Sequence, residues 1–309
     1  MRGRRGEASG RRTSCSYREG LRRPFKTRPR VRFAKSQKSI GYQRGIEIPF
    51  VLFYFWRATL SGRGEMTKTE LLRRLIDESS STVFFGGAGV SVASGIPDFR
   101  GTGGLYTECP EDKDPPEVIL RGDYLFSRPR DFYSYYVGNM LYPYAEPNPA
   151  HRALASLEKC GKLSAVITQN IDGLHQQAGS KRVIELHGSV ERNYFTRCQR
   201  TYSRDFIIDG AMSIGGVPRC ECGGTVRPDV TLYGEALDTE KFYDAEELIA
   251  ECELLIVGGT SLTVNPAASL IEAYMGERLV IINKSPTPYD DMAYLIIREN
   301  IEDVLSELV

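Results

Sequence analysis

Apolar and polar positions alternate along residues 67–309 with two different periods. Thr67 and Glu70 have the spacing of a helix capping box, and apolar residues follow at helical spacing over 71–76. Short apolar runs then have the length of buried strands, at 82–85, 164–168, 182–186, 254–257 and 279–282. Helical patterns lie between these runs, at 149–159, 239–251 and 266–274. Short strands separated by helices predict an α/β fold with a doubly wound parallel sheet.

Two stretches interrupt this rhythm. Residues 98–148 are dense in Tyr, Phe and Pro, and residues 190–236 contain three cysteines and many turn residues. We interpret both as insertions between strands of the sheet. Residues 67–97, 149–189 and 237–309 would then build the sheet and its helices.

The chain has no net charge, but its two parts are oppositely charged. Residues 1–65 carry 17 Lys and Arg against 4 Asp and Glu, a net of +13, so residues 66–309 carry a net of −13. No strand or helix period is defensible in 1–65. We expect that this stretch is a mis-assigned extension and that the functional protein begins at Met66. The alternative is a disordered basic arm, which would bind nucleic acid through its arginines.

The number of cysteines and the lengths of the apolar runs indicate a cytoplasmic protein that does not cross a membrane. The seven cysteines are odd in number and form no regular framework, which favours a reducing, cytoplasmic setting over a secreted disulfide scaffold. The long apolar run before the α/β pattern covers 48–56, far short of the roughly 20 residues of a spanning helix. We therefore expect no membrane association.

Polar or glycine-rich residues follow each expected strand. They are Gly86–Ser91, Thr168–His175, Glu185–Ser189, Gly258–Leu262 and Ile282–Lys284. The carboxyl ends of parallel strands meet at one edge of a sheet, where open α/β sheets bind their ligands. The first of these loops departs from the dehydrogenase fingerprint, because Val92 stands where the third glycine belongs. We expect a dinucleotide to bind there, but not for hydride transfer.

Five motifs in order resemble those of the sirtuin family. They are GAGVSVASGIPDFRG (87–101), TQNIDGLH (168–175), ELHGS (185–189), RPDVTLYGE (227–235) and GTSLTVNPAASL (259–270). The resemblance covers about residues 67–309 and implies a sirtuin catalytic domain over 66–309. In that family a large Rossmann-like domain carries a helical insertion, here 98–148, and a small zinc-ribbon-like module, here 190–236. The activity implied is NAD-dependent removal of acyl groups from protein lysines, giving nicotinamide and O-acyl-ADP-ribose.

The resemblance also implies roles for single residues. Phe99 would shield the reactive sugar carbon of NAD, and Val230, Gly234, Glu235 and Val264 lie in segments that hold the substrate peptide as an added strand. The implied NAD-binding residues are Gly87, Ala88, Gly89, Val92, Asp98, Phe99, Arg100, Gln169, Asn170, Ile171, Asp172, His187, Gly259, Thr260, Ser261 and Asn283.

His187 is the expected general base, with Asn170 and Asp172 as the other catalytic residues. A lone histidine at a strand end is more often a solvated or capping residue, but its place within Glu-Leu-His-Gly-Ser favours the catalytic role. An imidazole with a pKa near ~6.5 accepts a proton at neutral pH, here from a ribose hydroxyl. His151 and His175 lack such a context, and we interpret them as structural.

The zinc ligands that the resemblance implies are incomplete. Sirtuins typically hold structural zinc with four cysteines, and this chain offers Cys198, Cys220 and Cys222, with Phe195 where the fourth would be. Asp205 or water could complete a tetrahedron, or the cysteines could be buried small hydrophobes. We expect substoichiometric zinc, with the Phe195 ring packed in the module's interior.

Several functions remain open from the sequence. The same site could transfer ADP-ribose to a protein, hydrolyse NAD, or bind NAD without catalysis. The intact His187 and the peptide-flanking segments favour deacylation of acyl-lysine proteins. Residues 98–148 contain no Tyr-x-x-Arg pair of the kind that marks acid-acyl specialists in the family, so short neutral acyl groups are expected.

Overall fold

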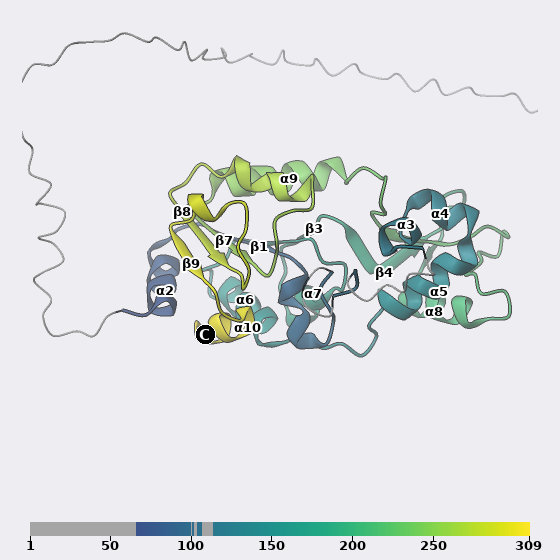
Figure 1. Ribbon diagram of the computed structural model, residues 1–309, viewed down its shortest axis with the longest axis horizontal. Coiled ribbons are helices and arrows are strands. Elements are labelled where there is room, and N and C mark those ends of the chain that lie inside the picture. Colours follow the sequence, from purple (N-terminus) through teal and green to yellow (C-terminus); the bar gives the residue numbers. More distant parts are fainter. Residues whose placement is uncertain (1–65, 100, 102–103, 107–113) are drawn as a thin grey trace, which may run out of the picture. The chain divides into compact units, whose positions relative to one another are not determined.

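Six parallel strands form the central sheet of this protein (Figure 1). The computed structural model describes residues 66–99, 101, 104–106 and 114–309. The sheet order is β3 (Val183–Glu185), β2 (Ala165–Thr168), β1 (Thr82–Gly86), β7 (Leu254–Gly258), β8 (Arg278–Ile282) and β9 (Leu295–Ile297). Every neighbouring pair is parallel. The predicted doubly wound fold is confirmed, and β9 is a strand that the apolar pattern did not predict.

Each face of the sheet is covered by helices. The face that includes Phe84 packs against α2 (Lys68–Glu78), α6 (Pro149–Lys159) and α10 (Ile301–Ser306). The opposite face, with Phe85, packs against α9 (Thr239–Glu251) and the 3₁₀ helix η3 (Ala267–Ala273). In Figure 1 α9 lies on one side of the strands, and α6 and α10 lie on the other. Strands buried on both faces explain why they read as unbroken apolar runs.

Side chains cap three of the four predicted helices, and at the start of α9 the Asp238 carboxylate accepts from the Glu240 amide at 3.0 Å. The Thr67 hydroxyl accepts from the Glu70 amide at 3.1 Å, and the Asn148 side chain accepts from the Ala150 amide at 2.9 Å at the start of α6. The helix expected over 266–274 is present, but it is not an α-helix. The segment is the 3₁₀ helix η3, whose N-cap is Pro266 and whose first turn receives no side-chain hydrogen bond.

The two insertions share one core. The first forms α3 (Pro116–Ile119), α4 (Gly122–Ser127) and α5 (Pro129–Asn139). The second forms α8 (Arg204–Met212) and an antiparallel sheet in the order β5 (Thr201–Tyr202), β4 (Gly188–Tyr194), β6 (Arg227–Val230). Phe132 stacks on Tyr136 with ring centroids 5.5 Å apart, and both are buried with Ile207 of α8. Segments far apart in sequence therefore depend on each other for burial.

The remaining short elements are loops that wind into single turns. They are η1 (Ala88–Val90), η2 (Val92–Ser94), α7 (Leu174–Ala178) and η4 (Asp290–Met292). No helix of the described residues has the length and apolar character needed to cross a membrane. The predictions about residues 1–65, as a mis-assigned extension or as a basic arm, fall on a stretch outside the described residues.

Candidate active site

The loops after β1 and β7 touch through their backbones. β1 and β7 are the neighbours at which the strand order reverses, the position where doubly wound sheets open a ligand crevice. The Gly89 amide donates to the Gly259 carbonyl at 2.8 Å. A Cβ on Gly259 would lie 2.5 Å from the Val90 nitrogen, and its φ of +60° is left-handed. Glycine is therefore required at 259 both for space and for backbone conformation.

A cavity of about 800 Å³ extends from these loops across the ends of the other strands to β6. This volume lies within the range of roughly 300–1,000 Å³ that is usual for small-molecule sites. The cavity is lined by nearly all the predicted NAD- and peptide-binding residues: Gly87, Ala88, Gly89, Val92, Asp98, Phe99, Gln169, Asn170, Ile171, Asp172, His187, Val230, Gly234, Glu235, Gly259, Thr260, Ser261, Val264 and Asn283. Arg100 lies outside the described residues.

His187 lies between the large sheet and β4, with a defined tautomer. Its Nδ1 is 2.8 Å from the Gln169 carbonyl oxygen. A carbonyl only accepts, so Nδ1 carries the proton and Nε2 keeps its lone pair. Burial lowers the pKa of His187 below its ordinary value, although the Gln169 carbonyl acts in the opposite direction. The imidazole is therefore neutral at pH 7 and can act as a base.

The backbone around His187 is fixed from two sides. The Leu186 amide donates to the Thr168 carbonyl at 3.0 Å, and the Thr231 amide donates to the His187 carbonyl at 2.9 Å. Glu185, which is buried, accepts from Gln176 at 2.8 Å and from Arg192 at 2.7 Å. The ring is thus held by rigid elements rather than by a free loop.

Ser91 joins Asn170 and Asp172 into one network. Its hydroxyl donates to an Asp172 carboxylate oxygen at 2.6 Å and accepts from the Asn170 amide nitrogen at 3.0 Å. The other Asp172 oxygen accepts from the Leu174 amide at 2.9 Å. Ser91 is fully buried and was missed as a site residue by sequence reasoning, although it stands inside the first motif. One feature of the sequence indicated this role. Ser91 carries a hydroxyl in the glycine-rich loop after β1, and the polar residues that follow β2 are expected at the same edge of the sheet.

The residues after β7 and β8 form the far part of the cavity. The Gln169 side chain donates to the Thr260 hydroxyl at 3.1 Å, which joins the β2 and β7 loops. Asn283 donates from its side chain to the Ser285 carbonyl at 2.8 Å, and its own carbonyl accepts from Arg298 at 2.9 Å. The hydroxyls and amides collected here match the donors and acceptors of ribose and adenine.

Phe99 lies in a loop that folds back on itself. The Asp98 carboxylate accepts from the Gly101 amide at 2.7 Å, and the Tyr106 amide donates to the Phe99 carbonyl at 3.0 Å. The Phe99 and Tyr106 rings are 5.4 Å apart, and the Tyr106 hydroxyl contacts the Tyr233 hydroxyl. Phe99 thus presents an apolar ring to the cavity beside the segment that follows β6.

The segment after β6 is held by one ion pair. Arg227 donates to both carboxylate oxygens of Glu235, at 2.8 and 2.9 Å, and also to the Val230 carbonyl at 3.1 Å. Burial alone would raise the pKa of Glu235, but Arg227 and the Leu232 amide hold it below its ordinary value. Glu235 is therefore ionised and fixes the turn between Leu232 and itself.

His151 and His175 lie away from the cavity, as interpreted from the sequence. Both are buried, and their rings lie 4.7 Å apart in a T-shaped arrangement. Burial lowers the pKa of His151 to about 4, and burial and the neighbouring His151 lower that of His175. Neither lines the cavity, so neither competes with His187 as a base.

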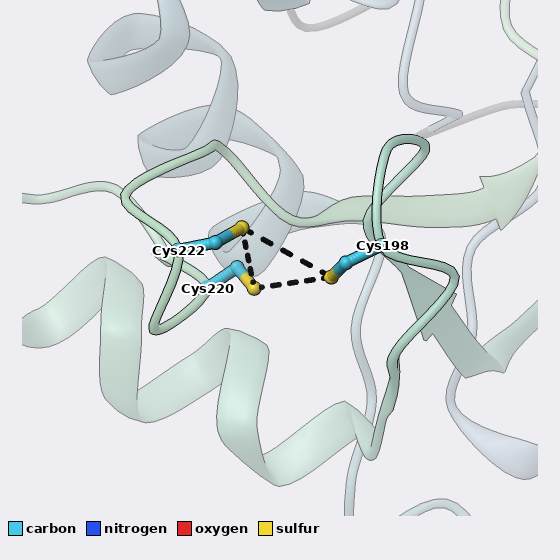
Figure 2. Close-up of side chains that lie close together, drawn as sticks. All are labelled: Cys198, Cys220 and Cys222. Atoms are coloured by element: carbon cyan, nitrogen blue, oxygen red, sulfur yellow. Dashed lines mark hydrogen bonds between the residues drawn. The ribbon is translucent and has the colours of Figure 1, made fainter. Parts of the chain in front are cut away.

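Cys198, Cys220 and Cys222 form a second cluster of chemistry, here named the thiol triad (Figure 2). Their sulfurs all lie within 4.8 Å of one another. Phe195 has no metal-binding atom to add to them. Its ring lies against Gly224, where an added Cβ would be 2.1 Å from Phe195 Cζ. Asp205 is not part of the group, and no other Asp, Glu or His among the described residues joins it.

Comparison with known proteins identifies the family. A model described as the Sir2 family matches residues 87–266. This chain belongs to the Sir2 family. It is 50% identical over 239 residues to an NAD-dependent protein deacetylase of Clostridium tetani, covering 77% of this chain and 96% of that protein. It is also 50% identical over 237 residues to one of Cutibacterium acnes, with the same shares covered.

Solved Sir2 structures resemble the described fold. One, a Sir2 variant with deacetylated p53 peptide and 3′-O-acetyl ADP ribose, is 39% identical with a TM-score of 0.72, covering 79% of this chain and 97% of that one. Another, Sir2 with p53 peptide and NAD⁺, is 39% identical with a TM-score of 0.70, covering 78% and 97%. The cavity residues of this Sir2 protein fit NAD, because main-chain groups, hydroxyls, amides and carboxylates line a cavity that opens at the switch point.

The thiol triad of this Sir2 protein does not fit a closed structural zinc site. Such sites hold four protein ligands in a tetrahedron, and three are present. The first position of the Cys-x-x-Cys pattern over 195–198 holds Phe195, whose ring packs against the core of the insertions. No step of the reaction below involves a metal.

Proposed function

We propose that this Sir2 protein is an NAD-dependent protein deacetylase that gives nicotinamide and O-acetyl-ADP-ribose. NAD supplies the ribose carbon that the acyl oxygen attacks and the ribose hydroxyl that receives the acyl group. The observation that carries the proposal is the hydrogen bond between His187 Nδ1 and the Gln169 carbonyl. It leaves Nε2 as a neutral base in a cavity of dinucleotide size.

The residues at the strand ends form two groups, which would bind the two halves of NAD. Gln169, Asn170, Ile171 and Asp172 would hold the nicotinamide ribose and amide, with Ser91 fixing the orientation of Asn170 and Asp172. The adenosine half would lie along the ends of β7 and β8. The residues proposed there are Gly259, Thr260, Ser261 and Asn283.

His187 would act as the base, and Phe99 would protect the reacting carbon. His187 removes a proton from the ribose hydroxyl through Nε2, and the Gln169 carbonyl stabilises the imidazolium that forms. Phe99 would keep water from the reacting carbon, since water there would hydrolyse NAD instead of allowing acyl transfer.

The acyl-lysine peptide has a geometric place beside β6. Among the residues that the structure describes, β6 pairs with β4 alone and is an edge of its sheet, so an extended peptide can add as a further strand. Val230 ends β6, Gly234 and Glu235 follow it, and Val264 faces the same cavity. We propose short neutral acyl groups as substrates, carried by lysines of other proteins in the cytoplasm. The five described cysteines are all free, which suits a reducing compartment.

The test is the release of nicotinamide from NAD with and without an acetyl-lysine peptide. Release that depends on the peptide, with equal amounts of deacetylated peptide and O-acetyl-ADP-ribose by mass spectrometry, is the expected result. Peptide-independent release would make the protein an NAD hydrolase. A protein or peptide carrying the mass of ADP-ribose would make it a transferase, and binding without release would make it an idle module.

A further inference from the structure

The thiol triad is a site separate from the NAD cavity. None of its three cysteines lines that cavity. Cys198 Sγ lies 3.5 Å from Cys220 Sγ and 4.0 Å from Cys222 Sγ, and Cys220 and Cys222 are 3.1 Å apart. All three thiols are free, and Cys198 and Cys222 are exposed. Figure 2 shows the three sulfurs pointing toward one another from two separate segments.

Two turns present these thiols, and contacts between protein groups join them. One turn is closed by the Gln199 amide donating to the Phe195 carbonyl at 2.9 Å, and it carries Cys198. The other is closed by the Cys220 amide donating to the Gly224 carbonyl at 2.8 Å. The Phe195 ring of the first turn lies on Gly224 of the second.

A polar contact joins the same two turns. Arg200 from the first turn makes an ion pair with Glu221 of the second. Cys220 is buried in the core of the insertions, and Phe195 packs against that core. The apolar ring and the ion pair thus do what a structural metal does elsewhere, which is to fix two turns together.

The number and kind of ligands in the thiol triad favour some metal ions over others. Zinc in a structural site takes four protein ligands, and the triad offers three. Thiolates are soft ligands and favour monovalent copper among the biological metals. Copper(I) is a filled-shell ion that is stable with three sulfurs in a plane, so it needs no fourth ligand.

The distances suit planar coordination. Metal–sulfur bonds of about 2.3 Å place the three sulfurs of a planar site roughly 4 Å apart. Two of the three separations, 3.5 and 4.0 Å, are already near that value, and the third must widen by less than about 1 Å. Exposed Cys198 and Cys222 give the ion a path from solvent.

We propose that the thiol triad binds copper(I) in a three-thiolate site, and that Phe195 excludes the closed zinc site from this protein. Binding forms three copper–sulfur bonds and releases the protons of the three thiols, with no change of oxidation state. The thiol triad is separate from the NAD cavity, so a test of copper binding does not depend on deacetylase activity.

The experiment uses the full chain, reduced, stripped of metal and kept without oxygen. Copper(I) is titrated against a chromophoric copper(I) chelator, and zinc against a zinc indicator. We expect one copper per chain at this site. Cys222→Ser should weaken copper binding by at least about 100-fold, since the loss of a ligand exceeds the 10–100-fold effect of an outer partner. Cys160→Ser, which changes an exposed cysteine elsewhere, should not alter it.

Phe195→Cys is the decisive variant because it restores a fourth thiol. It should bind zinc stoichiometrically and at least tenfold more tightly than the unchanged protein, whereas the latter should carry less than one zinc per chain. X-ray absorption at the copper edge should show three sulfur neighbours. Copper binding that survives Cys222→Ser, or zinc held as tightly without Phe195→Cys as with it, overturns the proposal. The thermal midpoint of the metal-free protein checks that each variant is folded.

Discussion

At the ends of β1 and β7 the cavity wall is made of main chain, whereas across the cavity, after β6, it is made of side chains. On the first side Gly89 and Gly259 are in backbone contact, with no room for a Cβ. On the second side the turn after β6 keeps its shape through Arg227 and Glu235. A wall of main chain fails when any atom is added, and a wall of side chains fails when a charge partner is removed.

The sharpest way to test the shared cavity is to remove the base that lies between the two walls. His187→Ala should lower deacetylation by at least about 100-fold, the usual contribution of a general base, while NAD affinity stays within a few-fold. Single-turnover rates and NAD titration measure the two separately. His187→Gln is the matched control: it can still donate to the Gln169 carbonyl but has no basic nitrogen, so it should be equally inactive. Undiminished turnover by His187→Ala would exclude His187 from the reaction.

The main-chain wall is tested by adding one methyl group. Gly259→Ala combines a left-handed φ of +60° with a Cβ 2.5 Å from the Val90 nitrogen, and should destabilise the fold by roughly 2–5 kcal/mol. Gly161→Ala is its control, because Gly161 has a φ of +70° with nothing within 4 Å. The control should lose about 1–2 kcal/mol in urea unfolding. Equal losses for the two variants would mean that the loops can separate freely.

Two buried histidines, His151 on α6 and His175 on α7, should make the stability of the protein sensitive to acid. The His151 pKa is lowered from 6.5 to about 4 in the folded state, and that of His175 is lowered too. The folded state therefore binds fewer protons, so this stability is complete above pH 6.5 and is lost as the pH falls toward 4. At pH 5 His151 alone should cost roughly 2 kcal/mol. Urea unfolding between pH 8 and 5 measures it, and a flat profile over that range would contradict it.

The side-chain wall is tested by a change that keeps the charge. Arg227→Lys retains a cation but cannot make the paired hydrogen bonds to both Glu235 oxygens, so the turn after β6 should loosen. We expect the KM for an acetyl peptide to rise about tenfold, or roughly 1.4 kcal/mol, with NAD affinity unchanged. Arg219→Lys is a surface control, as Arg219 contacts the Gly223 carbonyl. A change in NAD affinity of the same size would show that the two walls are not independent.

The difference between the walls also explains what could be predicted from sequence. Strands of the large sheet are buried on both faces, so their apolar runs stood out, and parallel pairing placed their polar ends together. These two features of the sequence alone place His187, Asn170 and Asp172 at one site. β9 was missed because the strand is only three residues long, Leu295–Ile297, and the charged residues Arg298 and Glu299 follow it directly.

The insertions were harder to predict because their core comes from distant segments. Phe132 and Tyr136 of α5 are buried by Ile207 of α8, and no local period encodes that contact. The role of Ser91 needed the distance to Asp172, which spacing along the chain does not give. The position of Phe195 was expected inside the module, and its ring packs against Gly224 of the facing turn.

The register of the large sheet limits how this chain can change in length. Gly86 pairs with Thr168 on one side and Gly258 on the other, Gly258 pairs with Ile282, and Ile282 pairs with Ile297. The last residues of these strands thus stand in one row. Inserting a single residue within β7 would push its loop about 3.3 Å beyond that row and exchange the two faces of the strand. Insertions and deletions should therefore be accepted at the opposite ends of the strands and in surface turns, such as that around Gly161, which holds no site residue.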